Sequence, residues 1–156
     1  MIEDFPNEFL KWLHTSFPSV KMLIDSKFII DGVMFYGTPW QPYFGGWGFN
    51  LPDLSDDLNK KYAVIPNEVS VLITHCPPQG ILDTSYQKIS TLSDLGCKSL
   101  KEWINHTELH PNLKIHAFGH IHSSNGVFKN GDVSFVNASI VDEDYNVSYE
   151  PITLDI

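Results

Sequence analysis

The feature that most constrains the fold is a pair of short strand-like runs, 69–74 and 113–118, separated by a helical pattern. The first run is Val-Ser-Val-Leu-Ile-Thr, and its β-branched residues are typical of a buried strand. Residues 97–108 place Leu100 and Ile104 at helical spacing. A strand–helix–strand unit predicts two parallel neighbouring strands joined by a right-handed crossover. We therefore expect an α/β fold.

The rest of the chain predicts further elements around this unit. In chain order they are a helix over 7–14, a hairpin over 22–36, an aromatic loop over 38–52, a helix over 55–62, a hairpin over 127–136 and a last strand over 147–154. The hairpins are expected to turn at Asp31-Gly32 and Asn130-Gly131. No repeat or linker divides the 156 residues, so we expect a single domain over 1–156.

Composition disfavours several classes of function. The net charge is −9 and only ten residues are lysine or arginine, whereas a general nucleic-acid binder needs a basic surface. No stretch is long and apolar enough to span a bilayer, and the acidic N-terminus does not resemble a signal peptide. We therefore expect no nucleic-acid or membrane binding and a cytoplasmic protein. Cys76 and Cys97 form no disulfide framework and are expected to be buried fillers, although Cys76 could also be a thiolate near a metal.

Three histidines follow the two central strands. His75 comes directly after the first run, and His120 and His122 come just past the second. The carboxyl ends of parallel strands open on one side of a sheet, where α/β proteins bind ligands. Gly119 permits a tight turn, and the alternation His-Ile-His can direct both imidazoles into one cleft. Because neutral imidazole binds Zn, Mn, Fe and Ni, we predict that His75, His120 and His122 bind a divalent metal ion.

The remaining histidines have structural explanations. His14, His106 and His110 are expected at helix surfaces or helix ends. His116 alternates with apolar neighbours inside 113–118. This predicts a hydrogen-bonded core residue, or one that supports a metal ligand, and not a ligand itself.

Two motifs resemble the last two motifs of the calcineurin-like metallophosphoesterases. They are Thr-His-Cys-Pro-Pro at 74–78 and Phe-Gly-His-Ile-His at 118–122. The chain is most similar to the small metallophosphoesterase-domain branch of the type expressed in brain, which has a similar aromatic loop at 36–52. That branch also matches Gly96-Cys97 and the Phe-Val-Asn-Ala-Ser stretch at 135–139. The resemblance extends from about residue 23 to residue 156.

The resemblance implies a fold, a site and a reaction. The fold is a sandwich of two mixed sheets with flanking helices. The site holds two metal ions bridged by a carboxylate and a hydroxide, and the hydroxide attacks phosphorus in line. By resemblance, His75 and His120 bind the second metal and His122 binds the first. The substrate is a small phosphate ester or a nucleotide.

The carboxylate-bearing half of that site has no counterpart in the sequence. By resemblance, this half carries an Asp-x-His motif, a Gly-Asp-x-x-Asp-like motif with the bridging carboxylate, and a Gly-Asn-His motif followed by Asp or Glu. The sequence has no Asp-x-His, its Gly131-Asp132 lies after the histidine motif, and its Asn105-His106 lacks the glycine and falls inside a predicted helix. Two close cations need anionic ligands to offset their repulsion, and three neutral histidines supply none. We therefore expect the C-terminal part of the sandwich without its N-terminal strands, and one ion rather than two for this chain alone. A complementary chain or self-association would cover the exposed sheet.

Several other residues have two interpretations. Five aromatic residues could form a wall for substrate, but packing of their loop onto the sheet is preferred: Trp40, Tyr43, Phe44, Trp47 and Phe49. Asn137 follows a predicted strand and could orient backbone near the histidine loop. The acidic residues 142–144 are expected to form a solvated turn, and residues 123–125 a polar loop.

Three hypotheses for function follow, and no catalytic residue is assigned. The first is a metal-dependent phosphoesterase, with phosphodiester hydrolysis expected, whose missing ligands come from another chain or subunit. The second is a catalytically inactive phosphoesterase-like protein that keeps only a binding or interaction surface. The third is a fragment with exposed apolar surface.

Overall fold

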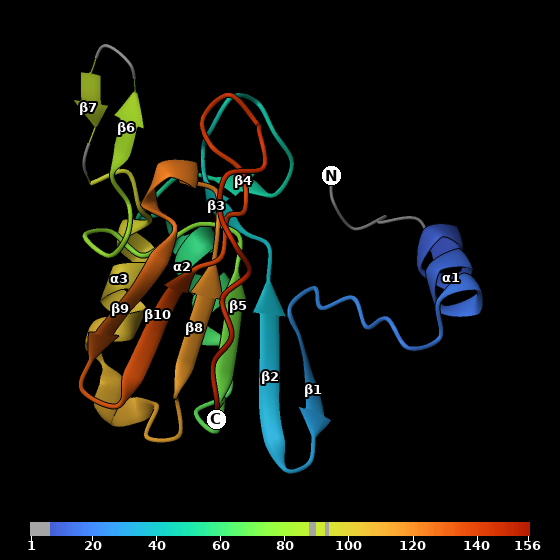
Figure 1. Cartoon of the computed structure of the whole chain (residues 1–156). Coiled ribbons are helices and arrows are strands. Elements are labelled where there is room, and N and C mark those ends of the chain that lie inside the picture. The colour runs from blue at the N-terminus through green and yellow to red at the C-terminus, as the bar shows by residue number, and fades with distance from the viewer. Residues whose placement is uncertain (1–6, 88–89, 93) are drawn as a thin grey trace.

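The computed structural model describes residues 7–87, 90–92 and 94–156, and its centre is a mixed six-stranded sheet (Figure 1). The strand order is β1-β2-β5-β8-β10-β9. The six strands are β1 (Ser26–Ile30), β2 (Val33–Thr38), β5 (Val71–Thr74), β8 (Ile115–Phe118), β9 (Gly126–Asn130) and β10 (Val133–Asn137). The four inner strands are parallel to one another, and the outer strands β1 and β9 are antiparallel hairpin partners. The predicted α/β class is confirmed.

The predicted strand–helix–strand unit is present at the centre of this sheet. Strand β5 pairs in parallel with β8, with Leu72 opposite His116. Helix α3 (Lys98–Asn105) lies between them in the chain and is followed by a 3-10 turn, η1 (Thr107–Leu109). The helix begins at Cys97, whose sulfur accepts a hydrogen bond from the Leu100 amide at 3.3 Å. The two runs of apolar residues therefore became neighbouring strands, as the sequence predicts.

A row of buried side chains crosses the four inner strands and forms the core together with the helices. The row consists of Tyr36, Leu72, His116 and Phe135, which lie opposite one another in the strand register. Helices α2 (Asp56–Ala63) and α3 cover one face of the sheet, as Figure 1 shows. Ser55 precedes helix α2 and caps its N-terminus, because its hydroxyl accepts a hydrogen bond from the Leu58 amide.

Two parts of the sequence prediction differ from the structure. The segment 147–154 is not a strand; Val147 is 78% exposed and makes only an isolated bridge to Val141. Pro151 lacks the amide donor that a strand ladder needs, and the segment passes over one face of the sheet instead (Figure 1). Short strand pairs also occur where none was predicted: β3 (Gln41–Pro42) with β4 (Asn50–Leu51), and β6 (Ser85–Gln87) with β7 (Ser90–Leu92).

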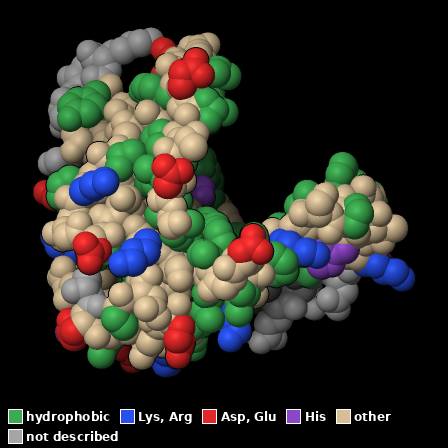
Figure 2. Space-filling model, turned by 60° about the horizontal axis from the view of Figure 1, so that its bottom comes forward, with side chains coloured by type: hydrophobic (Ala, Val, Ile, Leu, Met, Phe, Trp, Pro, Cys, Tyr) green, Lys and Arg blue, Asp and Glu red, His purple; other side chains and the backbone are tan. Residues whose placement is uncertain are grey.

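The second sheet of the expected sandwich is not among the described residues, and one face of the large sheet carries exposed apolar side chains. Phe28 and Ile30 on β1 and Ile73 on β5 are each more than a third exposed. Helix α1 (Asn7–Ser16) projects away from the body of the molecule (Figures 1 and 2) and bears exposed Trp12. Within the described residues, no helix has the length and apolar character needed to cross a membrane.

Asp25 connects the first hairpin to the body of the protein. Its carboxylate accepts hydrogen bonds from the Thr38 hydroxyl at 2.6 Å and from the Trp40 indole at 2.8 Å. The Lys61 ammonium is 3.0 Å from the same carboxylate and 4.1 Å from the centroid of the Trp40 ring. These contacts join β2, the aromatic loop and α2 around one partly buried charge.

We predict that Asp25→Asn lowers the free energy of unfolding by about 1–3 kcal/mol, because an amide cannot accept from all three donors and loses the charge. Asn tolerates the left-handed backbone at this position, where φ is 45°, so backbone strain does not contribute. Urea unfolding measures the change. Asp57→Asn is the control, because Asp57 forms only an exposed ion pair with Lys60. Equal effects of the two substitutions would contradict the role of Asp25.

Candidate metal centre

The candidate site lies where the central parallel strands end. His75 follows β5 directly, and the Gly119 amide, which follows β8, donates a 3.0 Å hydrogen bond to the His75 carbonyl. This bond continues the pairing of the two strands past their last ladder residues. It therefore brings the backbone of the first histidine beside the turn that carries the other two.

The turn after β8 is tight and strained at His120. The Ile121 amide donates to the Gly119 carbonyl at 2.9 Å, so the chain reverses around His120. His120 has φ of +72°, in the left-handed region that is unfavourable for a residue with a side chain. The sequence suggested Gly119 as the residue that permits the turn, but Gly119 has no positive φ and the strain falls on His120 itself. Such strain persists only where surrounding contacts hold it.

His75 and His120 face each other through ring nitrogens. The Nε2 atom of His75 is 3.2 Å from Nδ1 of His120, and the ring centroids are 4.8 Å apart. Burial lowers the pKa of both rings; for His120 the value is about 4, with further lowering from His75 and His122. Both rings are therefore neutral at pH 7, and neutral imidazole is the form that binds metal ions.

His122 lies on the same turn, and a backbone carbonyl determines its tautomer. Its Nδ1 is 2.9 Å from the Asp142 carbonyl oxygen, which can only accept, so Nδ1 carries the proton. Nε2 therefore keeps its lone pair, the arrangement common in histidines that bind a metal through Nε2. Tyr145 packs edge-on against the ring, with centroids 5.0 Å apart.

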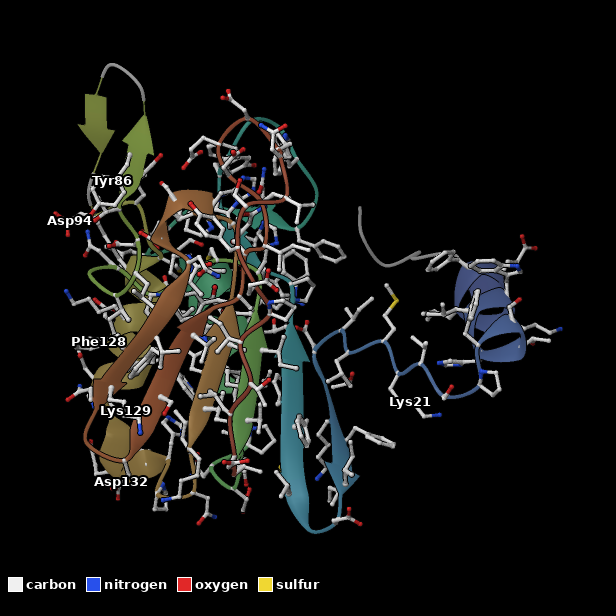
Figure 3. The ribbon with its side chains drawn as sticks, viewed as in Figure 1. Lys21, Tyr86, Asp94, Phe128, Lys129 and Asp132 are labelled. Carbon is white, nitrogen blue, oxygen red and sulfur yellow. The ribbon has the colours of Figure 1, made fainter. Side chains whose placement is uncertain are left out.

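His120 and His122 both line one cavity of about 200 Å³. Its other lining residues are Phe44, Trp47, Ser85, Leu95, Ile121, Glu143 and Tyr145. Figure 3 shows Tyr86 of the β6–β7 hairpin toward this end of the sheet, and Asp132 at the opposite end, in the turn between β9 and β10. The Gly131-Asp132 pair is therefore far from the histidines. His75 lines a separate hollow of about 340 Å³ that also includes Thr38, Pro39 and Ile73.

The aromatic loop divides between two roles. Trp40 is buried and Phe49 is half-buried, with ring centroids 5.6 Å apart, so this part packs onto the core as preferred from the sequence. Phe44 and Trp47 are exposed instead, and their centroids lie 4.8 Å and 6.0 Å from that of His120. For these two, the preferred interpretation was wrong, because they form a wall of the histidine cavity.

The acidic segment forms an exposed turn at Glu143 and Asp144, as predicted, and it also makes hydrogen bonds that were not predicted. The Glu143 carboxylate accepts hydrogen bonds from the hydroxyls of Ser85 at 3.0 Å and Ser123 at 2.7 Å. Asp142 accepts from the backbone amides of Asp144 and Asn146, both at 2.9 Å. No local signal indicates that Glu143 reaches the histidine turn, because its partners lie 20 and 58 residues away in the chain.

Two other histidines are buried. His116 is fully buried and its Nε2 is 2.9 Å from the Thr74 hydroxyl, which confirms the predicted hydrogen-bonded core residue. Because that hydroxyl donates to the Cys76 carbonyl, His116 must donate from Nε2. His110 was expected at a helix surface or end, but it is buried and stacked on Trp103 at 3.7 Å between centroids. Cys76 and Cys97 are both buried, as expected.

The spacing of the facing His75 and His120 rings fits one shared metal ion, but the three histidines together do not surround a single ion position. Two nitrogens bound at about 2.0–2.1 Å to one tetrahedral ion lie roughly 3.3–3.4 Å apart, close to the spacing of Nε2 of His75 and Nδ1 of His120. Among the described residues, no group of three or more histidine, cysteine, aspartate or glutamate side chains is arranged to hold a metal. A single ion bound by all three histidines is therefore not formed in this arrangement.

Comparison with known proteins gives several curated relatives. Metallophosphoesterase domain-containing protein 1 of Homo sapiens is 40% identical over 134 residues, which cover 86% of this chain and 39% of that protein. UPF0046 protein T07D4.2 of Caenorhabditis elegans is 35% identical over 134 residues, covering 86% of this chain and 32% of that protein. No protein-family model matches the chain. A solved structure with 17% identity aligns with a TM-score of 0.57 over 85% of this chain and 51% of that one.

The molecule is thus an α/β protein, and several of its relatives are named as metallophosphoesterase-domain proteins. More particularly, the chain is a homologue of the metallophosphoesterase domain-containing and UPF0046 proteins, which confirms the resemblance seen in the two motifs. It spans about two-fifths or less of the length of these relatives, as a C-terminal portion would. The names of these relatives imply a divalent metal cofactor in general terms.

We predict that His116 makes the protein less stable in acid. Burial lowers its pKa from 6.5 to about 3, so between these pH values the unfolded chain binds a proton that the folded chain does not. The free energy of unfolding therefore falls as pH decreases below 6.5, with a slope approaching about 1.4 kcal/mol per pH unit from this residue. His116→Gln should remove this contribution, and urea unfolding at a series of pH values measures it. His14→Gln, at an exposed position, should keep the full slope; an unchanged slope in His116→Gln would contradict the prediction.

Proposed function

We propose that this chain carries half of the active site of a metal-dependent phosphoesterase that hydrolyses phosphodiesters. The observation that supports the proposal most directly is the 3.2 Å approach of Nε2 of His75 to Nδ1 of His120 at the ends of adjacent parallel strands. Two neutral rings with facing nitrogens are an arrangement suited to one divalent ion, Zn, Mn, Fe or Ni. Their approach depends on the strand pairing and on the strained turn.

In this proposal the three histidines have different roles. His75 and His120 bind one ion, while Nε2 of His122 faces a second position, as in the resemblance to the calcineurin-like enzymes. A bound divalent ion supplies positive charge to phosphoryl oxygens and lowers the pKa of water. The anionic ligands that a second ion requires come from another polypeptide or subunit, because the described residues offer no cluster of three or more ligands.

The substrate in this proposal is a small phosphate ester or a nucleotide. Phe44, Trp47 and Tyr145 surround the cavity that His120 and His122 line, and exposed rings of this kind can contact an apolar or aromatic substituent of the ester. The net charge of −9 disfavours a long polyanion, while a bound cation would attract a single phosphate locally. The protein acts in the cytoplasm in this proposal.

The exposed face of the large sheet supports a role for a partner. Phe28, Ile30 and Ile73 are solvent-exposed although they lie on strands, and an apolar sheet face is normally covered. A complementary chain, or a second copy of this chain, would cover it and could contribute the missing ligands. Binding of that partner would then complete the site and cover the sheet at the same time.

A second candidate function is a catalytically inactive binding or interaction protein. The observation in its favour is that the part of the chain seen in the structure contains no three-residue ligand group. Such a protein would keep the cavity and its aromatic walls but would not need His75 and His120 to act together. Changing either histidine would then leave partner or ligand binding intact.

We predict that the metal-free protein binds one Co²⁺ ion per chain through His75 and His120. Titration followed by visible absorption should give one equivalent, and His75→Ala or His120→Ala should abolish the absorption bands, because one imidazole cannot hold the ion. His106→Ala, which removes an exposed ring, should bind as the unchanged protein does. Absence of binding, or equal binding in all variants, would contradict the proposed site.

Catalysis is tested separately with a chromogenic phosphodiester and Mn²⁺. Hydrolysis should be absent or very slow with this chain alone, and should appear when a chain carrying the Asp-x-His and Gly-Asn-His motifs is added. The same mixture made with His120→Ala should stay inactive. Metal binding without hydrolysis in the completed mixture would favour the inactive binding protein.

A further inference from the structure

Asn137, at the end of β10, is the most completely bonded buried polar side chain near the histidine turn. It has no solvent exposure. Its amide nitrogen donates to the carbonyl oxygens of Ile121 at 2.8 Å and Leu82 at 3.2 Å. Its amide oxygen accepts from the backbone amide of Ser139 at 3.1 Å. One side chain thus joins the histidine turn to the loop after β5 and to its own strand end.

Both carbonyls that Asn137 binds belong to strained stretches of backbone. Ile121 lies directly after His120, whose φ is +72°, and Leu82 itself has φ of +49°. Residues in this region cost free energy of the order of 1–3 kcal/mol and need surrounding contacts to hold them. The Gly119–His75 backbone bond holds the start of the histidine turn, and the Asn137 amide holds its middle.

The position of the Ile121 peptide unit affects the directions of the two rings that face the cavity. His120 and His122 flank Ile121 in the chain, so a shift of this peptide unit rotates both imidazoles. The His122 ring is separately oriented by the Asp142 carbonyl. The Ile121 carbonyl also accepts from the Ser124 backbone amide at 3.2 Å, a longer hydrogen bond than the one from Asn137. Without the Asn137 amide, the Ile121 carbonyl would lose the shorter of its two hydrogen bonds in this buried place, at a cost that favours rearrangement of the turn.

We infer that Asn137 is a positioning residue for the metal centre: it holds the strained His120 turn so that the rings of His120 and His122 keep their directions. This inference rests on the proposed metal site and adds a residue that does not touch the ion. Residues that orient metal ligands without touching the ion typically lower the metal affinity by about 10- to 100-fold when they are removed.

The test compares Asn137→Ala with Asn125→Ala. Asn125 is a matched control because its amide nitrogen also donates to two carbonyls, those of Asn137 at 3.3 Å and Ser139 at 2.8 Å, but not to the histidine turn. Co²⁺ titration of the folded proteins should show affinity reduced by about 10- to 100-fold for Asn137→Ala and unchanged for Asn125→Ala. Equal affinities of the two variants would overturn the inference.

A measurement without metal separates this inference from the proposed function. The ¹⁵N chemical shifts of the His122 ring should show a protonated Nδ1 in the unchanged protein and in Asn125→Ala, and a mixture of tautomers in Asn137→Ala. If the unchanged protein binds no Co²⁺, the proposed site fails, and the ring shifts still decide whether Asn137 orients the turn. Identical shifts in both variants would count against it.

A milder variant keeps the test decisive if Asn137→Ala does not fold. Asn137→Ser removes the reach to both carbonyls while leaving a small polar side chain, and it should show the same loss of Co²⁺ affinity. In the unchanged protein, the side-chain amide protons of Asn137 should exchange with solvent far more slowly than those of exposed Asn146. Fast exchange at Asn137 would show that the amide does not hold the turn.

Discussion

The parallel pairing of β5 with β8 is the interaction on which the rest of the structure depends. It places Leu72 beside His116 in the core and extends beyond the strands through the bond from Gly119 to the His75 carbonyl. Because that bond brings two strand ends together, the rings of His75 and His120 come into contact although the residues are 45 positions apart in the chain. Without this pairing, His75 would lie on a loop unconnected with the turn that carries His120 and His122.

The site also depends on strain that the neighbouring structure holds in place. His120 occupies an unfavourable backbone conformation, and its pKa is lowered to about 4 chiefly by burial. A left-handed turn and a desolvated ring each cost free energy, so both require compensation from packing and hydrogen bonds. The compensation comes from buried polar contacts such as Asn137 with Ile121, and from the aromatic ring of Phe44 beside His120. Contacts with the well-packed core beneath the turn thus offset the free-energy cost of its strained conformation.

The cavity contains both apolar walls and an ordered carboxylate. Phe44, Trp47 and Tyr145 supply the walls, and Glu143 is held by Ser85 and Ser123 instead of pointing freely into solvent. Hydroxyl donors satisfy one oxygen of this carboxylate and stabilise its charged form. The exposed acidic turn therefore also lines one side of the cavity.

The sequence by itself determined the central elements and the histidine motif. Buried-strand runs, apolar residues at helical spacing and glycine-containing hairpin turns are local signals, so β5, α3, β8 and both outer hairpins could be predicted from neighbouring residues. The preference for His75, His120 and His122 at strand ends followed from the same local order. Only the tertiary structure decided which rings face each other, where the strain lies and what lines the cavity. The contacts of His110 with Trp103, of Glu143 with Ser85 and of Phe44 with His120 join residues whose proximity depends on how separate elements pack. The path of the segment 147–154, which pairs with neither edge of the large sheet, was likewise decided by the tertiary structure.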